Sequence, residues 1–585
     1  MTAATQPPER GGSSARLSAL VVLVGLIVGG LALQAAESDD PGADPRRLVA
    51  GVVMPAARAE PTLSSTWFCA GGSALSDGVG DHALLLANPT DRARTATITA
   101  LTGDVAAPPA VDPQAPADPA QPSTTTTVAG TTSTVAPVER TPPVSRVVEV
   151  PAHGRFTMRL QEMVQSPLAG AVVEVEGGEI AVEHEITSDL GRATAPCSTT
   201  ASSRWAFPWG VTERGARELL VFMNPFPDDA TVDIAFATDE GVRDTLRFQG
   251  FVVPGRSVVG AYIDEDVQRR AHVSADIVVR GGRLVVDRIQ TFDGTDAREG
   301  ITLGLGAPAA AETWMFPDGL TGAGLTEQIV VFNPSDGVAE VEVEVRLDAA
   351  ALGTGDATTD DTPAGEDPVA GEEEPAADPE ATDGEATDEE ATQETTPPIE
   401  PPEPFELTVP SGRYAILDLH AQERVPAGLA HSLFVRSLNG VPVVAERVVT
   451  AGEGSPRRGI GATLGSPLGA STWYFPGGGP SPARDEFITL LNVSIGDPVT
   501  FSITGLASGQ LLAVQGLQDV DLPAGGRVSI RLGDHVERED LPIVVTADGA
   551  VVAERGLYRV GGDGLSHSMG IPLGADTVVP DPVDG

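Results

Sequence analysis

Short runs of alternating apolar and polar residues make up most of this chain. In segments such as 231–234 and 341–345, β-branched residues alternate with polar ones, and this period of two is typical of half-buried β-strands. Gly and Pro separate the runs, and no helical period is sustained after Ala36. The pattern therefore predicts an all-β fold.

One order of features occurs four times along the chain. Each copy opens on an aromatic strand, reaches a strand that ends at Asn, passes a turn with Pro, Gly and Arg, and closes on a Val-rich strand with an acidic residue. The spacing from Trp to Asn is 19 residues in the last three copies and 21 in the first. Recurrence at a fixed spacing is the signature of a repeat protein. The openings are marked by Trp67, Trp205, Trp314 and Trp473, which we expect to anchor the repeat cores.

Each repeat is expected to be an immunoglobulin-like β-sandwich, because short alternating strands separated by turns favour that architecture. Four such repeats in tandem predict a stiff, elongated rod. We assign residues 63–200, 201–309, 310–468 and 469–578 to repeats one to four, preceded by a cytoplasmic leader at 1–16, a transmembrane anchor or signal segment at 17–36 and a tether at 37–62, and followed by a tail at 579–585.

Two insertions interrupt the repeats. Residues 104–143 are rich in Pro, Ala and Thr, and residues 349–404 are rich in acidic residues, Pro and Thr and contain no basic residue. Neither has enough apolar surface to offset the entropy of ordering, so both are predicted to be disordered. They fall at the same point of the module, which indicates one loop that tolerates extension and points away from the neighbouring repeats.

Gly-rich segments at 300–304, 459–465 and 568–574 end the second, third and fourth repeats. No further Trp opening follows the last of them. We therefore predict that these residues form the last strand of each module rather than a linker.

The segment from 17 to 33 is apolar and uncharged, and Arg10 and Arg16 precede it. A helix of about 17 residues is at the lower limit for crossing a bilayer, and its positive flank would lie on the cytoplasmic side. The rest of the chain would then lie outside the cytoplasm. Because 34–36 make a poor cleavage site, we expect a retained single-pass anchor, with a removed signal peptide and a secreted protein as the alternative.

Cys69 and Cys197 are the two cysteines of the chain. At the place of Cys69 the other repeats have Phe207, Phe316 and Phe475, on the same side of the strand as the opening Trp, so Cys69 is expected to point into the core. Cys197 falls in the last strand of the same repeat. We predict a disulfide between them in an oxidising compartment, with two free buried thiols as the alternative.

The closing strands carry adjacent acidic and basic residues. Neighbours on a strand face opposite sides, so such a pair does not act together on one substrate. We interpret the pairs as structural ion pairs between strands or between repeats. They are Asp287 with Arg288, Glu446 with Arg447, and Glu554 with Arg555. In the first repeat His184 stands where the others have Arg, and its neighbours Glu183 and Glu185 face away from it, which argues against a metal cluster.

The formal net charge is −46, from 83 acidic and 37 basic residues, and every basic residue is Arg. This excess argues against nucleic acid or an anionic lipid surface as a partner. The sequence contains no metalloprotease, nucleophile-elbow or phosphate-loop motif, and no Asp-x-Asp-x-Asp spacing that would support Ca²⁺ between repeats. We expect no catalytic residue, no cofactor and no metal site.

Few aromatic residues are left for stacking on sugars once the four opening Trp are placed in the cores. An exposed Trp209 or Tyr474 would favour a carbohydrate-binding module. The Thr/Pro tract of the first insertion is a candidate for O-mannosylation. Asn492 begins an N-glycosylation triplet, but its recurring place in the module predicts that it ends a strand.

The Trp-x-Phe-Pro opening at 205–208, the Asn-Pro strand end at 224–225, the turn at 523–527 and the closing strand at 551–555 resemble repeats of secreted or membrane-anchored actinobacterial proteins. The function of that family is not established. The resemblance covers residues 63–578, and Trp-Phe-Cys at 67–69 is similar to the family's N-terminal end. It implies a β-rich fold and an envelope location, and it carries over no catalytic residue. The Glu-rich insertion and Val493, in place of Pro, depart from the pattern.

These observations predict a non-catalytic, membrane-anchored, extracytoplasmic repeat protein of the bacterial cell envelope with a structural or binding role. One alternative is a carbohydrate- or cell-wall-binding module or adhesin. Another is an accessory subunit of envelope-polymer synthesis or export. The expected partners are the membrane and a cell-wall polymer or envelope protein.

Overall fold

The structure is a computed structural model that describes residues 53–59, 61–106, 141–295, 298–348, 401–562, 564–574 and 577–578. Within these residues the long elements are all strands, so the all-β prediction is confirmed. None of the helices in the described part is long and apolar enough to cross a membrane. The leader, the expected anchor at 17–36, most of the tether, the tail and most of both insertions lie outside the described residues.

The strands group into four units, which we number along the chain. Unit 1 contains β1 (Ser64–Cys69), β2 (Asp81–Asn88), β3 (Arg94–Val105), β4 (Val144–Val150), β5 (Gly154–Arg159), β6 (Leu168–Glu176), β7 (Ala181–Ser188) and β8 (Gly191–Pro196). Unit 2 contains β9 (Arg204–Phe207), β10 (Ala216–Asn224), β11 (Ala230–Thr238), β12 (Gly241–Val253), β13 (Ser257–Tyr262), β14 (Val273–Gly281), β15 (Val285–Asp293) and β16 (Glu299–Leu305).

Units 3 and 4 continue the series. Unit 3 contains β17 (Thr313–Leu320), β18 (Leu325–Asn333), β19 (Ala339–Leu347), β20 (Phe405–Val409), β21 (Arg413–Asp418), β22 (Ala430–Ser437), β23 (Val444–Ala451) and β24 (Gly459–Leu464). Unit 4 contains β25 (Gly469–Phe475), β26 (Arg484–Asn492), β27 (Val499–Leu506), β28 (Leu511–Ala513), β29 (Val520–Leu522), β30 (Arg527–Arg531), β31 (Ile543–Arg559), β32 (Leu565–Met569), β33 (Ile571–Pro572) and β34 (Thr577–Val578). Short 3-10 helices, η2 (Leu160–Glu162), η3 (Ile263–Glu265) and η5 (Leu532–Asp534), follow β5, β13 and β30.

The same strand order recurs from unit to unit. Unit 1 has the orders β1-β6-β3-β4 and β5-β2-β7-β8, and unit 3 has β17-β22-β19-β20 and β21-β18-β23-β24. In the immunoglobulin sandwich the orders are ABED and CFG, so the first strand lies beside the second, whereas β1 pairs with β6 here. The immunoglobulin-like part of the prediction is therefore not confirmed.

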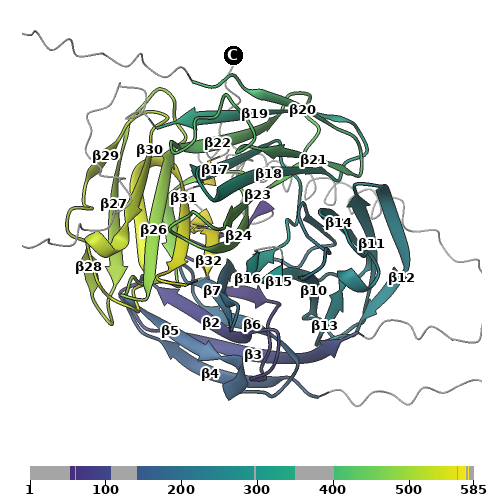
Figure 1. Cartoon of the computed structure of the whole chain (residues 1–585). Coiled ribbons are helices and arrows are strands. Elements are labelled where there is room, and N and C mark those ends of the chain that lie inside the picture. The colour runs from purple at the N-terminus through teal and green to yellow at the C-terminus, as the bar shows by residue number, and fades with distance from the viewer. Residues whose placement is uncertain are drawn as a thin grey trace, which may run out of the picture.

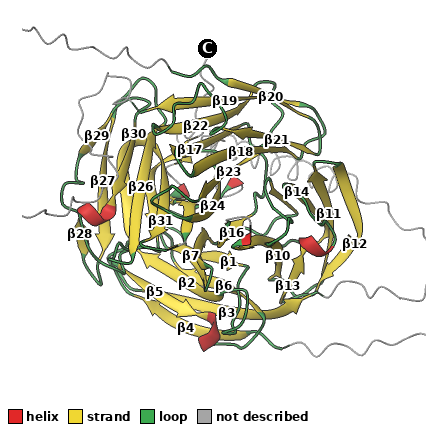
Figure 2. Ribbon diagram, viewed as in Figure 1, coloured by secondary structure: helices red, strands yellow, loops and turns green. Residues whose placement is uncertain are grey.

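The four units close into a ring, and the expected rod is wrong (Figure 1). The last strands of the units, β8, β16, β24 and β32, contact one another in cyclic order, and β32 returns to β8. Figure 2 shows the strands arranged around the centre of the ring. We call the four boundaries between neighbouring units seams 1–2, 2–3, 3–4 and 4–1. The rod was inferred from the short junctions along the chain, which say nothing of contacts between the first and the fourth unit.

The Gly-rich segments at 300–304 and 459–465 form β16 and β24, as predicted, and their glycines let the strands approach. For the fourth unit the predicted segment lies too late in the chain, because β32 ends at Met569 and contains only the first two residues of 568–574. A Cβ on Gly461 would lie 2.7 Å from the Cδ2 atom of His567 in the next unit. A Cβ on Gly300 would lie 3.1 Å from Ile460 across seam 2–3. Larger residues at these positions would hold the units apart.

Residues 53–59 form a strap that joins units 1, 3 and 4. Met54 is buried in the shared core of units 3 and 4. Ala57 donates its N–H to Pro572 and accepts a hydrogen bond from the N–H of Gly574, both at 2.8 Å. The carbonyl of Arg58 accepts a hydrogen bond from Glu179 of unit 1 at 2.6 Å. The strap thus runs across seam 4–1.

The recurring Asn ends a strand in every unit and ties the turn that follows to the rest of its unit. Its side-chain amide donates to two or three carbonyls, such as those of Arg92 and Val150 in the case of Asn88, and its oxygen accepts a backbone N–H two residues on. The four residues, all buried, are Asn88, Asn224, Asn333 and Asn492. Because such an amide satisfies several buried backbone groups, its recurrence has a structural reason, also at Asn492.

The predicted disulfide is confirmed. Cys69 ends β1, Cys197 follows β8 directly, and their Cα atoms are 4.7 Å apart. The bond ties the first strand of unit 1 to the end of its last strand, although the two cysteines are 128 residues apart in the chain. The first insertion lies between them.

Replacing both cysteines, C69A/C197A, is expected to lower the free energy of unfolding by up to ~4–5 kcal/mol, because the bond restricts a long loop of the unfolded chain. Thermal unfolding of the full-length chain with and without reductant measures this. A wild-type melting temperature that does not respond to reductant would contradict the expectation, provided that thiol titration shows complete reduction.

Candidate functional site

An acidic residue of each closing strand is buried at a seam and is shared between two units. In every seam it accepts a backbone N–H that follows the opening Trp of the preceding unit, and in three seams it also accepts hydrogen bonds from the Arg of that unit's closing strand. The predicted ion pairs therefore connect different units rather than neighbouring residues. The pairs are Arg288 with Glu446, Arg447 with Glu554, and Arg555 with Glu183, and His184 faces Asp287.

Seam 4–1 shows the arrangement most completely. The Arg555 Nη2 donates to both Glu183 oxygens at 3.1 and 3.0 Å, and the N–H of Gly477 donates to the Oε2 atom at 2.8 Å. Arg555 also donates to the hydroxyls of Thr194 and Ser568 at 3.1 Å each. Both charged side chains are fully buried, so the ring is closed by a desolvated ion pair with several additional hydrogen bonds.

Seam 2–3 follows the same plan. Arg288 donates to both carboxylate oxygens of Glu446, and the N–H of Trp209 donates to the Oε2 atom at 3.2 Å. The guanidinium of Arg288 also lies 4.9 Å from the centre of the Trp209 ring. Trp209 is thereby buried in the seam, where it stacks near Phe292, and only 2% of its surface is exposed.

At seam 3–4, Arg447 donates to Glu554, and the N–H of Asp318 donates to the Oε2 atom of Glu554 at 3.3 Å. His567 lies nearby, with its Nδ1 atom 3.3 Å from Glu554. Asp318, Glu554 and His567 could offer three ligand atoms to a metal ion. However, the guanidinium of Arg447 already lies beside all three, so the negative charge of this cluster is compensated within the protein.

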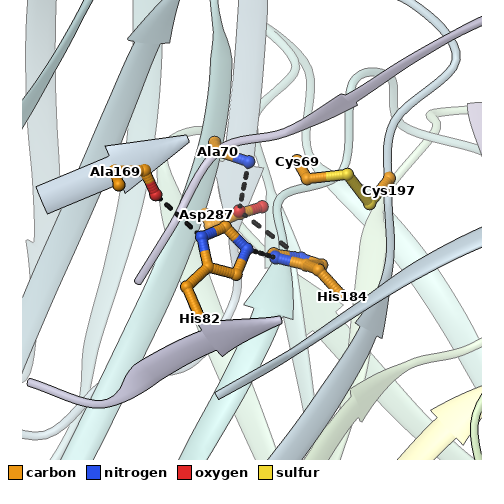
Figure 3. Close-up of a disulfide and its surroundings, with 7 residues drawn as sticks. All are labelled: Cys69, Ala70, His82, Ala169, His184, Cys197 and Asp287. Atoms are coloured by element: carbon orange, nitrogen blue, oxygen red, sulfur yellow. Dashed lines mark hydrogen bonds and ion pairs between the residues drawn. A yellow bond between two sulfur atoms is a disulfide. The ribbon is translucent and has the colours of Figure 1, made fainter. Parts of the chain in front are cut away.

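At seam 1–2, His184 takes the place of the arginine found at the other seams (Figure 3). The Nε2 atom of His184 is 3.6 Å from Asp287, which also accepts the N–H of Ala70 at 3.1 Å. Behind it, His82 shares a hydrogen bond of 3.0 Å with His184. Burial lowers the pKa of His82 to about 4 and that of His184 well below its ordinary value, and it raises the pKa of Asp287 to about 7. This seam is therefore held by nearly neutral groups.

Sequence reasoning missed a second set of buried titratable residues, each six positions before the recurring Asn. The set is His82, Glu218, Glu327 and Glu486, all with no exposed surface. Glu327 and Glu486 accept backbone N–H groups of their own unit, from Leu320 at 3.1 Å and from Gly479 at 2.5 Å. Aligning the repeats at the Asn would have revealed the set, because three of its four members are Glu within an apolar strand.

Unit 1 differs from the others at both titratable positions at once. It has His82 where they have Glu, and His184 where they have Arg. Replacing the acid and the base together keeps the buried charge balanced, which is required because an unpaired buried charge is strongly destabilising.

Glu218 has no hydrogen-bond partner for either carboxylate oxygen among the described residues. Val211 of unit 2 corresponds to Leu320 and Gly479, but it donates its N–H to Gln290 at 2.9 Å and not to Glu218. Burial raises the pKa of Glu218 to about 8, against the lowering effect of the Arg288 charge. The carboxyl is therefore largely protonated at neutral pH.

The Arg of the Pro-Gly-Arg turns reaches the preceding unit in two seams. Arg527 donates to the carbonyl of Pro317 at 2.8 Å, and Arg155 donates to the carbonyl of Pro476 at 3.3 Å. Both lie opposite the residue before the recurring Asn. In unit 3 Arg413 lies opposite the recurring Asn itself. In unit 2 Ser257 lies opposite the Asn and Arg256 precedes it, so the four arginines do not occupy equivalent positions.

A groove of about 660 Å³ opens at seam 4–1, beside the buried ion pair. Its walls come from β2, β5, β7 and β8 of unit 1 and from β26, β31 and the loops next to them in unit 4. Five arginines line it, against three acidic residues. The arginines are Arg155, Arg159, Arg192, Arg484 and Arg559.

Residues 165–297 match the model of a family of unknown function (DUF5719). The match runs from the second half of unit 1 through β15 of unit 2, so it includes His184 and Asp287. No curated protein matches the chain. A solved structure described as "Crystal Structure of Thermotoga maritima 1070" is similar over 27% of this chain and 94% of that chain, at 16% identity and a TM-score of 0.16. At these values nothing about this chain follows from it.

Truncating Arg555 to Ala is expected to lower the free energy of unfolding by about 3–5 kcal/mol, because it leaves Glu183 buried without its cation. Truncating Arg531, an exposed residue of the same unit that pairs with Asp485, should cost no more than about 1 kcal/mol. Chemical denaturation of the full-length variants measures both. Equal effects of R555A and R531A would contradict a role for the seam.

The variant E218Q should flatten the dependence of stability on pH. Because the folded-state pKa of Glu218 is raised to about 8 from an ordinary 4.5, the folded state binds more protons than the unfolded state in this window. The wild type should therefore lose up to about 1.4 kcal/mol per pH unit relative to E218Q as pH rises from about 4.5 to about 8. Thermal melts of both proteins across this range measure the difference, and a constant difference would refute the assignment.

Proposed function

We propose that this chain is a non-catalytic, membrane-anchored protein of the bacterial cell envelope, whose extracytoplasmic part is a closed ring of four β-sandwich units with a structural or binding role. The observation that carries the proposal is the buried position of the acid and base pairs of the closing strands. The residues that suggested chemistry in the sequence are buried at the seams, where substrate has no access, and they are paired with each other.

The compartment is inferred from the disulfide and from the apolar segment at 17–33. Disulfides form and persist outside the reducing cytosol, and Cys69–Cys197 lies within the core of unit 1. The apolar segment precedes the strap in the chain. A single-pass topology with the ring outside the cytoplasm accounts for both features.

The carbohydrate-binding alternative loses its expected aromatic platforms. Trp209 is buried at seam 2–3, and Tyr474 packs against the core of unit 1 and is 4% exposed. Stacking of sugars on these two rings is therefore not available in the closed ring. A role as an accessory subunit of envelope-polymer synthesis or export stays a second candidate, because it depends on the anchor and not on a ligand.

Fractionation of cells that produce the full chain with a C-terminal tag tests the proposal. We expect the tag in the membrane fraction after carbonate extraction, accessible to protease in cells whose outer layers have been removed, and Cys69 and Cys197 blocked to alkylation. A cytosolic protein with two free thiols would overturn it. A C69A/C197A variant is the control for the alkylation signal.

A further inference from the structure

The repeats show where seam 4–1 departs from the other seams. Arg192 pairs with Thr187 in the β7–β8 ladder, and the equivalent positions of the other units hold Ile301, Ile460 and Leu565, which are all buried. A charged residue thus replaces a buried aliphatic one in unit 1 alone. It does so in the wall of the groove.

The facing wall shows a second departure. Arg484 and Arg559 lie directly opposite each other in the β26–β31 ladder. The equivalent pairs are Ala216 with Phe292 in unit 2 and Leu325 with Ala451 in unit 3. Like charges directly opposite on neighbouring strands repel each other, so this pair is unfavourable unless another group compensates it.

The protein itself compensates these charges only in part. Arg484 donates to the carbonyls of Gly479 and Glu539, and not to a carboxylate. For Arg559 no side-chain partner is found among the described residues, whereas Arg192 lies 3.3 Å from Glu185. Burial lowers the pKa of Arg484, and the nearby charge of Arg192 lowers it further.

The other two arginines of the groove already have carboxylate partners. Arg155 is bound to Asp540 across the seam, and Arg159 lies 3.4 Å from Asp81. Arg192 is likewise paired with Glu185, so the positive charge without a carboxylate partner among the described residues is concentrated at Arg484 and Arg559, with Arg192 close to Arg484. This excess is opposite in sign to the whole chain, which has 83 acidic and 37 basic residues.

We propose that the groove at seam 4–1 binds an anionic ligand through Arg192, Arg484 and Arg559, with a phosphate or carboxylate group between them. The planar guanidinium binds both groups by paired hydrogen bonds. The volume of about 660 Å³ fits a small molecule or a short segment of an anionic polymer. The inference names the ligand class for the proposed binding role and rests on it, but its test does not depend on where the protein resides.

The test is isothermal titration of the full-length chain in a neutral detergent at low salt, with sodium tripolyphosphate, citrate and uncharged maltotriose as probes. The variant R192Q/R559Q removes two charges from the groove. The control R243Q/R280Q removes two charges from exposed arginines of unit 2 that do not line the groove, so it changes the net charge equally.

We expect one saturable site for tripolyphosphate or citrate, none for maltotriose, and about tenfold weaker binding in R192Q/R559Q, with the control within about twofold of the wild type. Binding of tripolyphosphate alone assigns a phosphate, and binding of citrate alone assigns a carboxylate. Absence of saturable binding to both anions, or equal weakening in the control, would overturn the proposal. Fractionation results for the proposed location would be unaffected by that outcome.

Discussion

The fold depends on a carboxylate that two units share. Glu183, Glu446 and Glu554 each lie in one unit and receive a guanidinium and a backbone N–H from the unit before it. A buried carboxylate is tolerated only with such partners, because desolvation costs several kcal/mol per ion. Opening any of these seams would therefore leave two charges unpaired. Because the ring is closed, Arg555 of unit 4 pairs with Glu183 of unit 1. Units 1 and 4 therefore need no additional unit to cover these buried charges.

The seams share this plan but differ in the chemistry around it. At seam 1–2 the ion pair is replaced by histidines and an aspartate that is partly neutral, and a short parallel pairing of β3 with β13 adds backbone hydrogen bonds. At seam 2–3 the aromatic Trp209 fills the space. At seam 4–1 the strap of residues 53–59 and the turn arginine Arg155 cross the boundary. Each seam thus supplements the shared carboxylate with its own contacts.

Departures from the repeat separate structural positions from candidate binding positions. Residues that recur in every unit, such as the buried Asn and the opening Trp, satisfy backbone groups or fill cores. Arg192, Arg484 and Arg559 interrupt otherwise apolar or small positions in one seam only. Arg484 and Arg559 repel each other across the ladder, which is why we assign this group of arginines to a ligand rather than to the fold.

The sequence by itself determined the features that depend on local pattern. Alternation and turn residues determined the β-strands, registry of the repeats determined the last strands of units 2 and 3, and inward alternation placed Cys69 in the core of its unit. Only the tertiary structure decided the ring, the partners of the closing acids and the burial of Trp209 and Tyr474. Arg555 and Glu183 are 372 residues apart, and strand periodicity gives the face of each side chain but not the unit that covers it. Closure depends on how four modules pack, and that geometry is encoded in contacts which no local pattern reveals.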